Sequence, residues 1–269
     1  MIPWRNLKRF FYKSVKQPVY AFRVLTKRSG AYLYYSFSTG KSIRPEAVTL
    51  FLTYRCNLRC KMCGQWGEAG VTKKQGREIL KQELNFQDLK KLVEELALFK
   101  PNITLFGGEP LLFTECVELA AYIKEKGMHS LMITNGSLLE NFAEGLVNAG
   151  LDELNLSLDG GRELHDHIRG MPGLFERIMK GLEKVNYCKA EKNSKKPFIN
   201  LQCTITKYNY EHLQQLTEAA KAIKANSLTF HNLIFLNREA LQKQKSFDQA
   251  LGFSSADWEG FVFEPGIDI

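Results

Sequence analysis

The chain has 269 residues, enough to bury a sizeable core in one α/β barrel or two small domains. With 44% hydrophobic and 25% charged residues, its composition is that of a globular protein and excludes a disordered polymer. The net charge of +8 is uneven, because residues 1–45 hold ten Lys or Arg and no acidic residue. Removing those ten from the 37 basic residues leaves 27 against all 29 acidic ones, a net charge of −2.

No apolar stretch reaches the roughly 20 residues that span a bilayer. Lys8, Arg9 and Lys13 interrupt any run that would resemble a signal peptide. We therefore expect a cytoplasmic protein, in which the six cysteines stay reduced and indicate metal binding or burial before disulfides. The nearly neutral remainder argues against nucleic acid as a partner, because tracking phosphates needs a basic stripe.

Residues 1–45 are predicted to form a basic N-terminal extension. As a helix, residues 4–16 carry an apolar stripe, with Arg and Lys on the opposite side; the stripe consists of Trp4, Leu7, Phe11 and Val15. A basic amphipathic helix suits an anionic membrane surface, so we expect peripheral membrane contact through residues 1–18. The alternative is that the stripe packs on the barrel or on another copy of the chain.

Residues 46–236 alternate between strand and helix patterns. Strands are expected at residues 47–53, 103–106, 130–134, 154–158, 199–206 and 227–235, and helices at residues 83–100, 112–126, 138–149, 174–188 and 210–224. Six strands with five intervening helices predict a parallel α/β sheet with right-handed crossovers.

Two of these strands alternate apolar and polar residues. Leu154, Leu156 and Leu158 alternate with Asn155, Ser157 and Asp159, and residues 200–205 repeat the pattern. If the apolar face packs on helices, the polar face lines the concave side. We therefore predict an open, partial barrel around a wet cavity, with Gln202, Thr204 and His231 facing it. Residues 237–269 show only a weak helical pattern. We expect this segment to be either the true end of the protein or a truncated piece.

Three cysteines follow the first predicted strand as CxxxCxxC: Cys56, Cys60 and Cys63. Three thiolates on one loop can bind three irons of a [4Fe–4S] cluster and leave the fourth iron open. A structural zinc site normally needs four protein ligands, and three unrelated buried cysteines are the other alternative. Cys116, Cys188 and Cys203 are expected to be buried as small apolar residues instead.

This motif, followed after the second strand by Gly107-Gly108-Glu109-Pro110, resembles the radical S-adenosylmethionine (radical SAM) superfamily over about residues 47–235. His165-Asp166-His167-Ile168-Arg169-Gly170 resembles the HDxxRG stretch of the SPASM- and twitch-type subgroup. The resemblance implies a partial (β/α)6 barrel, with SAM chelating the open iron. It also implies reductive cleavage of SAM to a 5′-deoxyadenosyl radical, which abstracts hydrogen from a substrate.

The resemblance also implies roles for individual residues. Gly107 and Gly108 would let the backbone approach SAM, Glu109 would accept from its ammonium, and Arg169 would pair with its carboxylate. Further SAM contacts are implied for Asn135, for Ser157 and Asp159 at the ribose, and for Met62 at the adenine. Met62 stands where the family often has an aromatic residue.

The expected function is therefore a radical SAM enzyme for a polar or amphiphilic substrate, such as a peptide, a lipid-linked molecule or another small molecule. It would take electrons from a one-electron reductant such as flavodoxin or ferredoxin. The alternative is an iron–sulfur electron-transfer or sensing protein without SAM chemistry. No cysteine follows Cys203, so either auxiliary clusters are absent or their domain is missing from the chain.

Overall fold

The computed structural model describes residues 11, 14–15, 18–37, 42–68, 70–252 and 257–262. The chain divides into two compact units, Met1–Val48 and Thr49–Ile269. Of the segment after residue 236, which was predicted as a separate piece, the structure describes residues 237–252 and 257–262.

The first unit contains helix α2 (Pro18–Phe37), which the hydrophobic pattern did not predict. Its large apolar side chains are exposed: Val19 at 82%, Tyr35 at 83% and Phe37 at 85%. Arg28 Nε lies 3.0 Å from Glu46 Oε1. Most of the helix predicted over residues 4–16 lies outside the described residues. Among the described residues no helix is long and apolar enough to cross a membrane.

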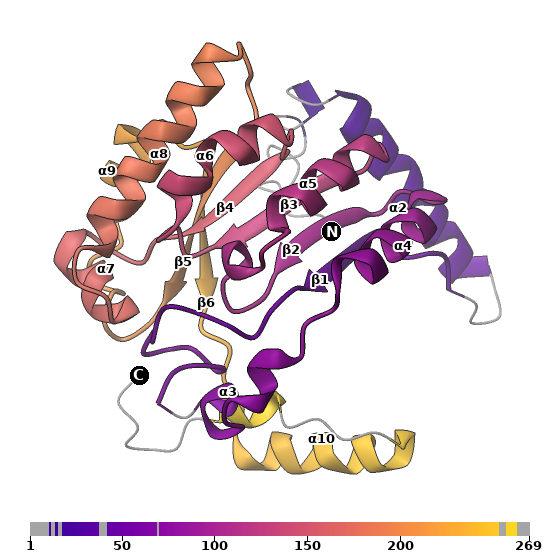
Figure 1. Ribbon diagram of the computed structural model, residues 1–269. Helices are drawn as coiled ribbons and strands as arrows, with labels where there is room; N and C mark the ends of the chain where they lie inside the picture. The colour runs from indigo at the N-terminus through magenta and orange to yellow at the C-terminus, as the bar shows by residue number, and fades with distance from the viewer. Residues whose placement is uncertain are drawn as a thin grey trace. The chain divides into compact units, whose positions relative to one another are not determined.

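The second unit is built on one six-stranded sheet whose strands follow chain order (Figure 1). The pairs from β2 to β6 are all parallel. The strands are β1 (Ala47–Phe51), β2 (Asn102–Phe106), β3 (His129–Thr134), β4 (Glu153–Ser157), β5 (Phe198–Ile205) and β6 (Ser227–Asn232). The predicted α/β fold with a partial-barrel strand order is confirmed.

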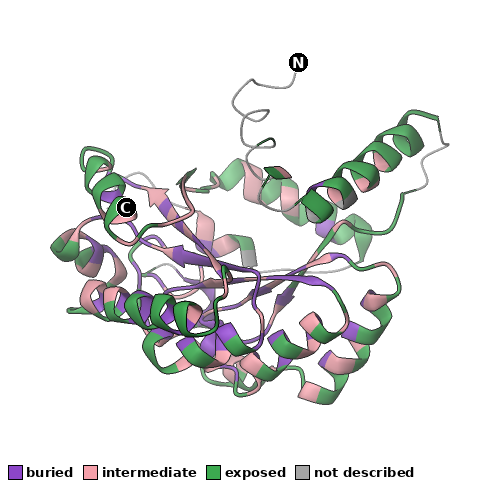
Figure 2. Ribbon diagram, turned by 90° about the horizontal axis from the view of Figure 1, so that it is seen from above, coloured by how far each residue is buried: buried purple, intermediate pink, exposed green. Residues whose placement is uncertain are grey.

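Helices connect the strands and bury their apolar sides, while their outer sides stay exposed (Figure 2). In α4 the buried residues Leu89, Val93 and Leu96 recur at helical spacing, and Asn85 caps the first turn by accepting from Asp88 N at 2.9 Å. Neighbouring helices pack in sequence, α4 on α5, α5 on α6 and α6 on α8. Their bounds are α4 (Phe86–Ala97), α5 (Cys116–Glu125), α6 (Leu139–Asn148), α8 (Leu174–Glu191) and α9 (Gln214–Ala222).

The two faces of the sheet differ as the alternation predicted. Leu154, Leu156 and Leu201 are completely buried, and Leu156 lies beside Ile178 of α8 at Gly136. The register pairs Ser157 with Gln202 and Gln202 with Thr229, so these side chains share the face away from the helices. Thr204 and His231 are paired on that same face, and His231 is exposed.

Three helices depart from the sequence pattern. Residues 162–169, where the sequence pattern predicted no helix, form α7 (Arg162–Arg169), and the weakly patterned segment after residue 236 contains α10 (Arg238–Leu251). Helix α5 begins at residue 116 instead of 112, because Glu109 caps a short 3₁₀ turn, η2 (Pro110–Leu112), through Leu111 N. The remaining short elements are α3 (Val71–Lys74), η1 (Glu78–Lys81) and η3 (Asp257–Phe261).

Candidate functional site

The cysteine loop follows β1 at the carboxyl edge of the sheet, where ligand sites of parallel α/β proteins form. Cys56, Cys60 and Cys63 are free thiols. A tight turn holds the last two, with Cys63 N donating to Cys60 O at 3.1 Å. Trp66 fixes the far side of the loop, because its Nε1 donates to Tyr54 O at 2.7 Å.

Each of the three sulfurs faces a different N–H donor. Asn135 Nδ2 lies 3.9 Å from Cys56 Sγ, Arg169 Nη1 lies 3.8 Å from Cys60 Sγ, and Trp66 N lies 3.3 Å from Cys63 Sγ. Donors around the sulfurs suit thiolates that carry charge, and such hydrogen bonds also tune iron–sulfur clusters. The donor set therefore fits an iron–sulfur cluster chemically.

The thiols are not arranged around a single point. Within the described residues, no three His, Cys, Asp or Glu side chains converge closely enough to hold one metal ion. A structural zinc site would need four protein ligands around one ion, whereas the three thiolates of a cubane bind three different irons. Burial raises the pKa of the Cys56 thiol to about 12 and also raises that of Cys60. Any metal ion that bound these thiols as thiolates would have to displace their protons.

Gly107 and Gly108 bring the end of β2 against the cysteine loop. A Cβ at Gly108 would lie 2.3 Å from Arg55 O, and one at Gly107, where φ is 155°, would lie 2.7 Å from Thr53 O. Gly108 N donates to Thr53 O at 2.8 Å. In this structure the two glycines therefore allow the end of β2 to approach the backbone that carries the first cysteine.

The Glu109 carboxylate is fully buried and connects the ends of two strands through hydrogen bonds. Oε1 accepts from Thr134 Oγ1 at 2.7 Å and from Leu111 N at 3.2 Å, and Oε2 accepts from Asn135 N at 2.8 Å. Burial raises the pKa of this carboxyl, and these hydrogen bonds oppose the rise. The hydrogen bond from the SAM ammonium to Glu109 stays a prediction. The ligand would have to share carboxylate oxygens that already accept from protein donors.

Asn135, Ser157 and Met62 gather around the same edge. Asn135 Nδ2 donates to Asn57 Oδ1 at 3.0 Å, in addition to facing Cys56. Ser157 ends β4 and is partly exposed, whereas Met62 is buried beside Cys63 in the loop. These residues come from three different connections, and their predicted SAM contacts stay predictions.

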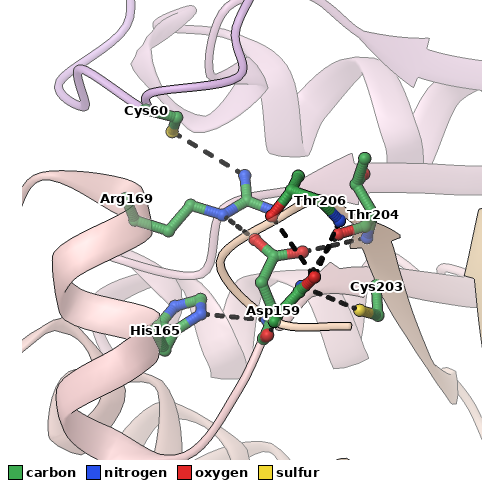
Figure 3. Close-up of polar contacts among 8 residues, drawn as sticks. Cys60, Asp159, His165, Arg169, Cys203, Thr204 and Thr206 are labelled. Atoms are coloured by element: carbon green, nitrogen blue, oxygen red, sulfur yellow. Dashed lines mark hydrogen bonds and ion pairs between the residues drawn. The ribbon is translucent and has the colours of Figure 1, made fainter. Parts of the chain in front are cut away.

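Arg169 and Asp159 form a buried ion pair (Figure 3). Arg169 Nε lies 2.5 Å from Asp159 Oδ2, and Thr204 N donates to Asp159 Oδ1 at 2.9 Å. Burial is the largest single influence and lowers the pKa of Arg169, but the charges of Asp159 and Cys60 and the hydrogen bonds to both together raise the pKa above its ordinary value. Both Asp159 oxygens are therefore engaged by the protein, and the predicted bond to the ribose stays a prediction. Arg169 is not a solvated loop residue, because its side chain is 12% exposed at the end of α7.

His165 and Asp166 hold the backbone around this pair. His165 Nδ1 accepts from Asp159 N at 3.1 Å, which leaves the ring proton on Nε2. Burial lowers the pKa of His165 to about 3, so the ring stays neutral. Asp166 caps α8 by accepting from Gly173 N at 2.5 Å and from Phe175 N at 2.8 Å.

Asn209 completes the network and was not singled out in the sequence. Its Nδ2 donates to Asp159 O and to Thr204 O, both at 2.9 Å, and its Oδ1 accepts from Thr206 N at 2.7 Å. The fully buried side chain thus joins the ends of β4 and β5. A lone Asn in a polar loop gives no sequence signal for such a role.

The C-terminal segment packs against the cysteine loop from the other side. A Cβ at Gly260 would lie 1.7 Å from Gly64 O, and one at Gly64 would meet the Phe261 ring at 2.7 Å. Leu236 N donates to Phe261 O at 2.7 Å. The cysteine loop therefore lies between the sheet edge and η3. The other cysteines, Cys116, Cys188 and Cys203, are buried in α5, α8 and β5, and Cys203 Sγ accepts from Asn209 Nδ2 at 3.5 Å.

Residues 50–218 match the sequence profile of the Radical SAM superfamily. The chain belongs to this superfamily. Radical SAM proteins are enzymes that use a [4Fe–4S] cluster and SAM. Membership of the superfamily therefore assigns the chain to this class of enzyme. The predicted superfamily, enzyme class and cofactors are confirmed at this level.

Curated relatives are enzymes of the same superfamily. The chain is 34% identical over 198 residues to Fe-coproporphyrin III synthase of Methanosarcina barkeri, covering 72% of this chain and 46% of that protein. It is 34% identical over 184 residues to AdoMet-dependent heme synthase of the same organism (67% and 48%). It is 34% identical over 146 residues to a probable GTP 3′,8-cyclase of Methanococcus maripaludis (54% and 46%). The chain spans about half the length of these relatives.

Solved structures share the fold. Streptococcus suis SuiB bound to S-adenosylmethionine superposes with a TM-score of 0.59 at 14% identity, covering 86% of this chain and 52% of that one. Native anSMEcpe with bound AdoMet and Kp18Cys peptide superposes with a TM-score of 0.57 at 18% identity (78% and 62%).

Proposed function

We propose that Cys56, Cys60 and Cys63 hold a [4Fe–4S] cluster at which SAM is reductively cleaved. The observation that carries the proposal is the loop itself, in which three free thiols each face a separate N–H donor. When bound, the cluster supplies the electron that converts SAM to methionine and a 5′-deoxyadenosyl radical, and the radical takes hydrogen from the substrate. A one-electron reductant such as flavodoxin or ferredoxin would deliver that electron.

The residues around the loop would bind and orient SAM. Arg169 presents a guanidinium suited to a carboxylate, Asn135 and Ser157 present neutral polar groups, and Met62 presents a thioether to the adenine. Gly107 and Gly108 bring the strand end close to the loop, and Glu109 holds its backbone. Asp159 acts on SAM through Arg169.

The substrate is proposed to be polar or amphiphilic, as a peptide or a lipid-linked molecule would be. On β4 to β6 the face away from the helices carries mostly neutral amides and hydroxyls, namely Asn155, Asn200, Gln202, Thr204 and Thr229, with Glu153 and Phe198 at its other end. On β1 to β3 the face is more apolar, with Thr104 beside the partly exposed side chains of Phe51, Phe106, Leu131 and Ile133. A molecule with one polar and one apolar part would match both halves of this face.

Peripheral membrane contact is proposed for the N-terminal unit. Exposed apolar side chains of the unit extend from Phe11 and Val15 through α2 to Phe37. All ten charged residues up to position 45 are basic. Apolar and cationic side chains together favour an anionic lipid surface, to which each Lys or Arg adds about 1 kcal/mol.

Anaerobic reconstitution tests the proposed chemistry. The wild type should bind about four irons per chain and release 5′-deoxyadenosine when SAM and dithionite are added. Alanine at Cys56, Cys60 or Cys63 should abolish both, whereas the triple replacement of Cys116, Cys188 and Cys203 is the matched control and should keep the iron. Full iron in any one of the loop variants would refute the ligand assignment. A complete cluster without 5′-deoxyadenosine would favour an electron-transfer or sensing protein.

A further inference from the structure

The Asp159–Arg169 pair reaches a predicted cluster ligand directly. Arg169 Nε lies 2.5 Å from Asp159 Oδ2, and its Nη1 lies 3.8 Å from Cys60 Sγ (Figure 3). The guanidinium is planar, so a carboxylate that fixes Nε also restricts where Nη1 can point. The Arg169 guanidinium is therefore a buried cation that contacts the Asp159 carboxylate through Nε and directs Nη1 at the Cys60 sulfur.

Asp159 is itself held from several sides, so it can act as a fixed anchor. Its Oδ1 accepts from Thr204 N at 2.9 Å, its backbone N donates to His165 Nδ1 at 3.1 Å, and its backbone O accepts from Asn209 Nδ2 at 2.9 Å. The carboxylate has no exposed surface. Rotation of Asp159 would break bonds to both β5 and α7.

We propose that Asp159 is a positioning residue that holds Arg169 against the Cys60 sulfur, and that Arg169 thereby raises the reduction potential of the cluster. Reduction adds negative charge to a cluster and its thiolates. A nearby cation and an N–H···S hydrogen bond stabilise that reduced form, and cluster potentials depend on both. The inference rests on the proposed function for the presence of the cluster, but the effect requires no SAM.

The test is a redox titration of reconstituted, SAM-free protein followed by EPR. At one applied potential, Arg169→Met should lower the ratio of reduced to oxidised cluster about tenfold, which is ~59 mV for one electron. Arg169→Lys keeps the charge but cannot reach Asp159 and Cys60 in the same planar geometry, so its shift should be smaller and of the same sign.

The Asp159→Asn variant distinguishes a positioning role of Asp159 from a direct effect of its own negative charge on the potential. If Asp159 acted only through its own negative charge, removing that charge would raise the potential. If it positions Arg169, the arginine loses its ionic anchor and the potential falls, as in the Arg169 variants. The sign of the shift therefore decides between the two roles.

Asp152→Asn is the matched control. Asp152 is also a buried carboxylate, paired with Lys124 at 2.7 Å, but it precedes β4 whereas Asp159 follows that strand. This variant should lose stability and keep the wild-type potential. Failure of the wild type to bind iron would count against the proposed function, whereas a full cluster with unchanged potentials in the Arg169 and Asp159 variants would overturn only the present inference. Loss of iron in all three of those variants, with iron kept in the control, would overturn it too and assign the pair to cluster retention.

Discussion

The Glu109 carboxylate accepts a hydrogen bond of 2.8 Å from the backbone nitrogen of Asn135, so the turn after β2 is tied to the turn after β3. Glu109→Gln would turn one of its oxygens into an N–H donor, which leaves at least one buried donor without an acceptor. We expect a loss of about 1–3 kcal/mol in the free energy of unfolding, measured with urea.

The control for this variant is Glu118→Gln on the exposed side of α5, which should stay within about 0.5 kcal/mol of the wild type. An equally small change in Glu109→Gln would show that the buried carboxylate contributes little to the strand ends.

Gly108→Ala should disturb the cysteine loop, because the new Cβ would lie 2.3 Å from Arg55 O. The backbone next to Cys56 must then move, and we expect iron bound after reconstitution to fall to less than about half of the four irons of a cubane. Gly30→Ala is the control, because a Cβ there meets no atom within 4 Å. Full iron in Gly108→Ala would mean that the loop tolerates the displacement.

His165 should make the protein less stable in mild acid. Its folded-state pKa of about 3 lies below the ordinary value of 6.5, so below pH 6.5 the unfolded chain takes up a proton that the folded chain refuses. The stabilisation is complete above pH 6.5 and is lost as the pH falls, by up to ~1.4 kcal/mol per pH unit. Urea titrations at several pH values should give a flatter dependence for His165→Gln than for the wild type. Parallel curves would contradict a neutral buried histidine.

Gln202→Leu and His231→Leu should leave SAM cleavage without substrate unchanged. Both residues lie on the sheet face away from the helices, where they are proposed to contact the substrate and not to bind the cluster. The rate of 5′-deoxyadenosine release with dithionite should therefore equal that of the wild type, whereas hydrogen abstraction from the true substrate should be impaired. A severalfold loss of release without substrate would assign these side chains to SAM binding.

The N-terminal extension should bind anionic vesicles. Co-sedimentation with phosphatidylserine-containing liposomes should be strong for the full chain, weaker at high salt, and lost after deletion of residues 1–18, because the contacts are partly ionic. Phosphatidylcholine vesicles provide the uncharged control. Equal binding by the deleted protein would move the contact to α2, and no binding by the full chain would end the membrane proposal.

Alternating apolar and polar residues in two strands, β4 and β5, predicted the two faces of the sheet. Leu154 and Leu156 mark the buried face, and Asn155 marks the polar one. The cysteine spacing likewise predicted the position of the candidate site, since three thiols so close together on one loop are typical of a metal or cluster site.

Long-range hydrogen bonding could not be predicted in the same way. In α7 only His165 and Ile168 are buried, so apolar periodicity cannot reveal this helix. The partners of Asp159 and Glu109 are backbone groups and side chains from neighbouring connections, and a carboxylate that binds protein looks the same in sequence as one that binds a ligand. Asn209 gave no signal because its role depends on where β4 and β5 end.

The contact of Gly64 with Gly260 has a consequence for the order of folding. Strands β1 to β6 pair in chain order, so each strand can add to its predecessor as soon as it is synthesised. The cysteine loop differs, because Gly64 packs against a residue near position 260. Its packing is completed only after the whole sheet has emerged, so the cysteine loop lacks its contact with η3 through most of synthesis.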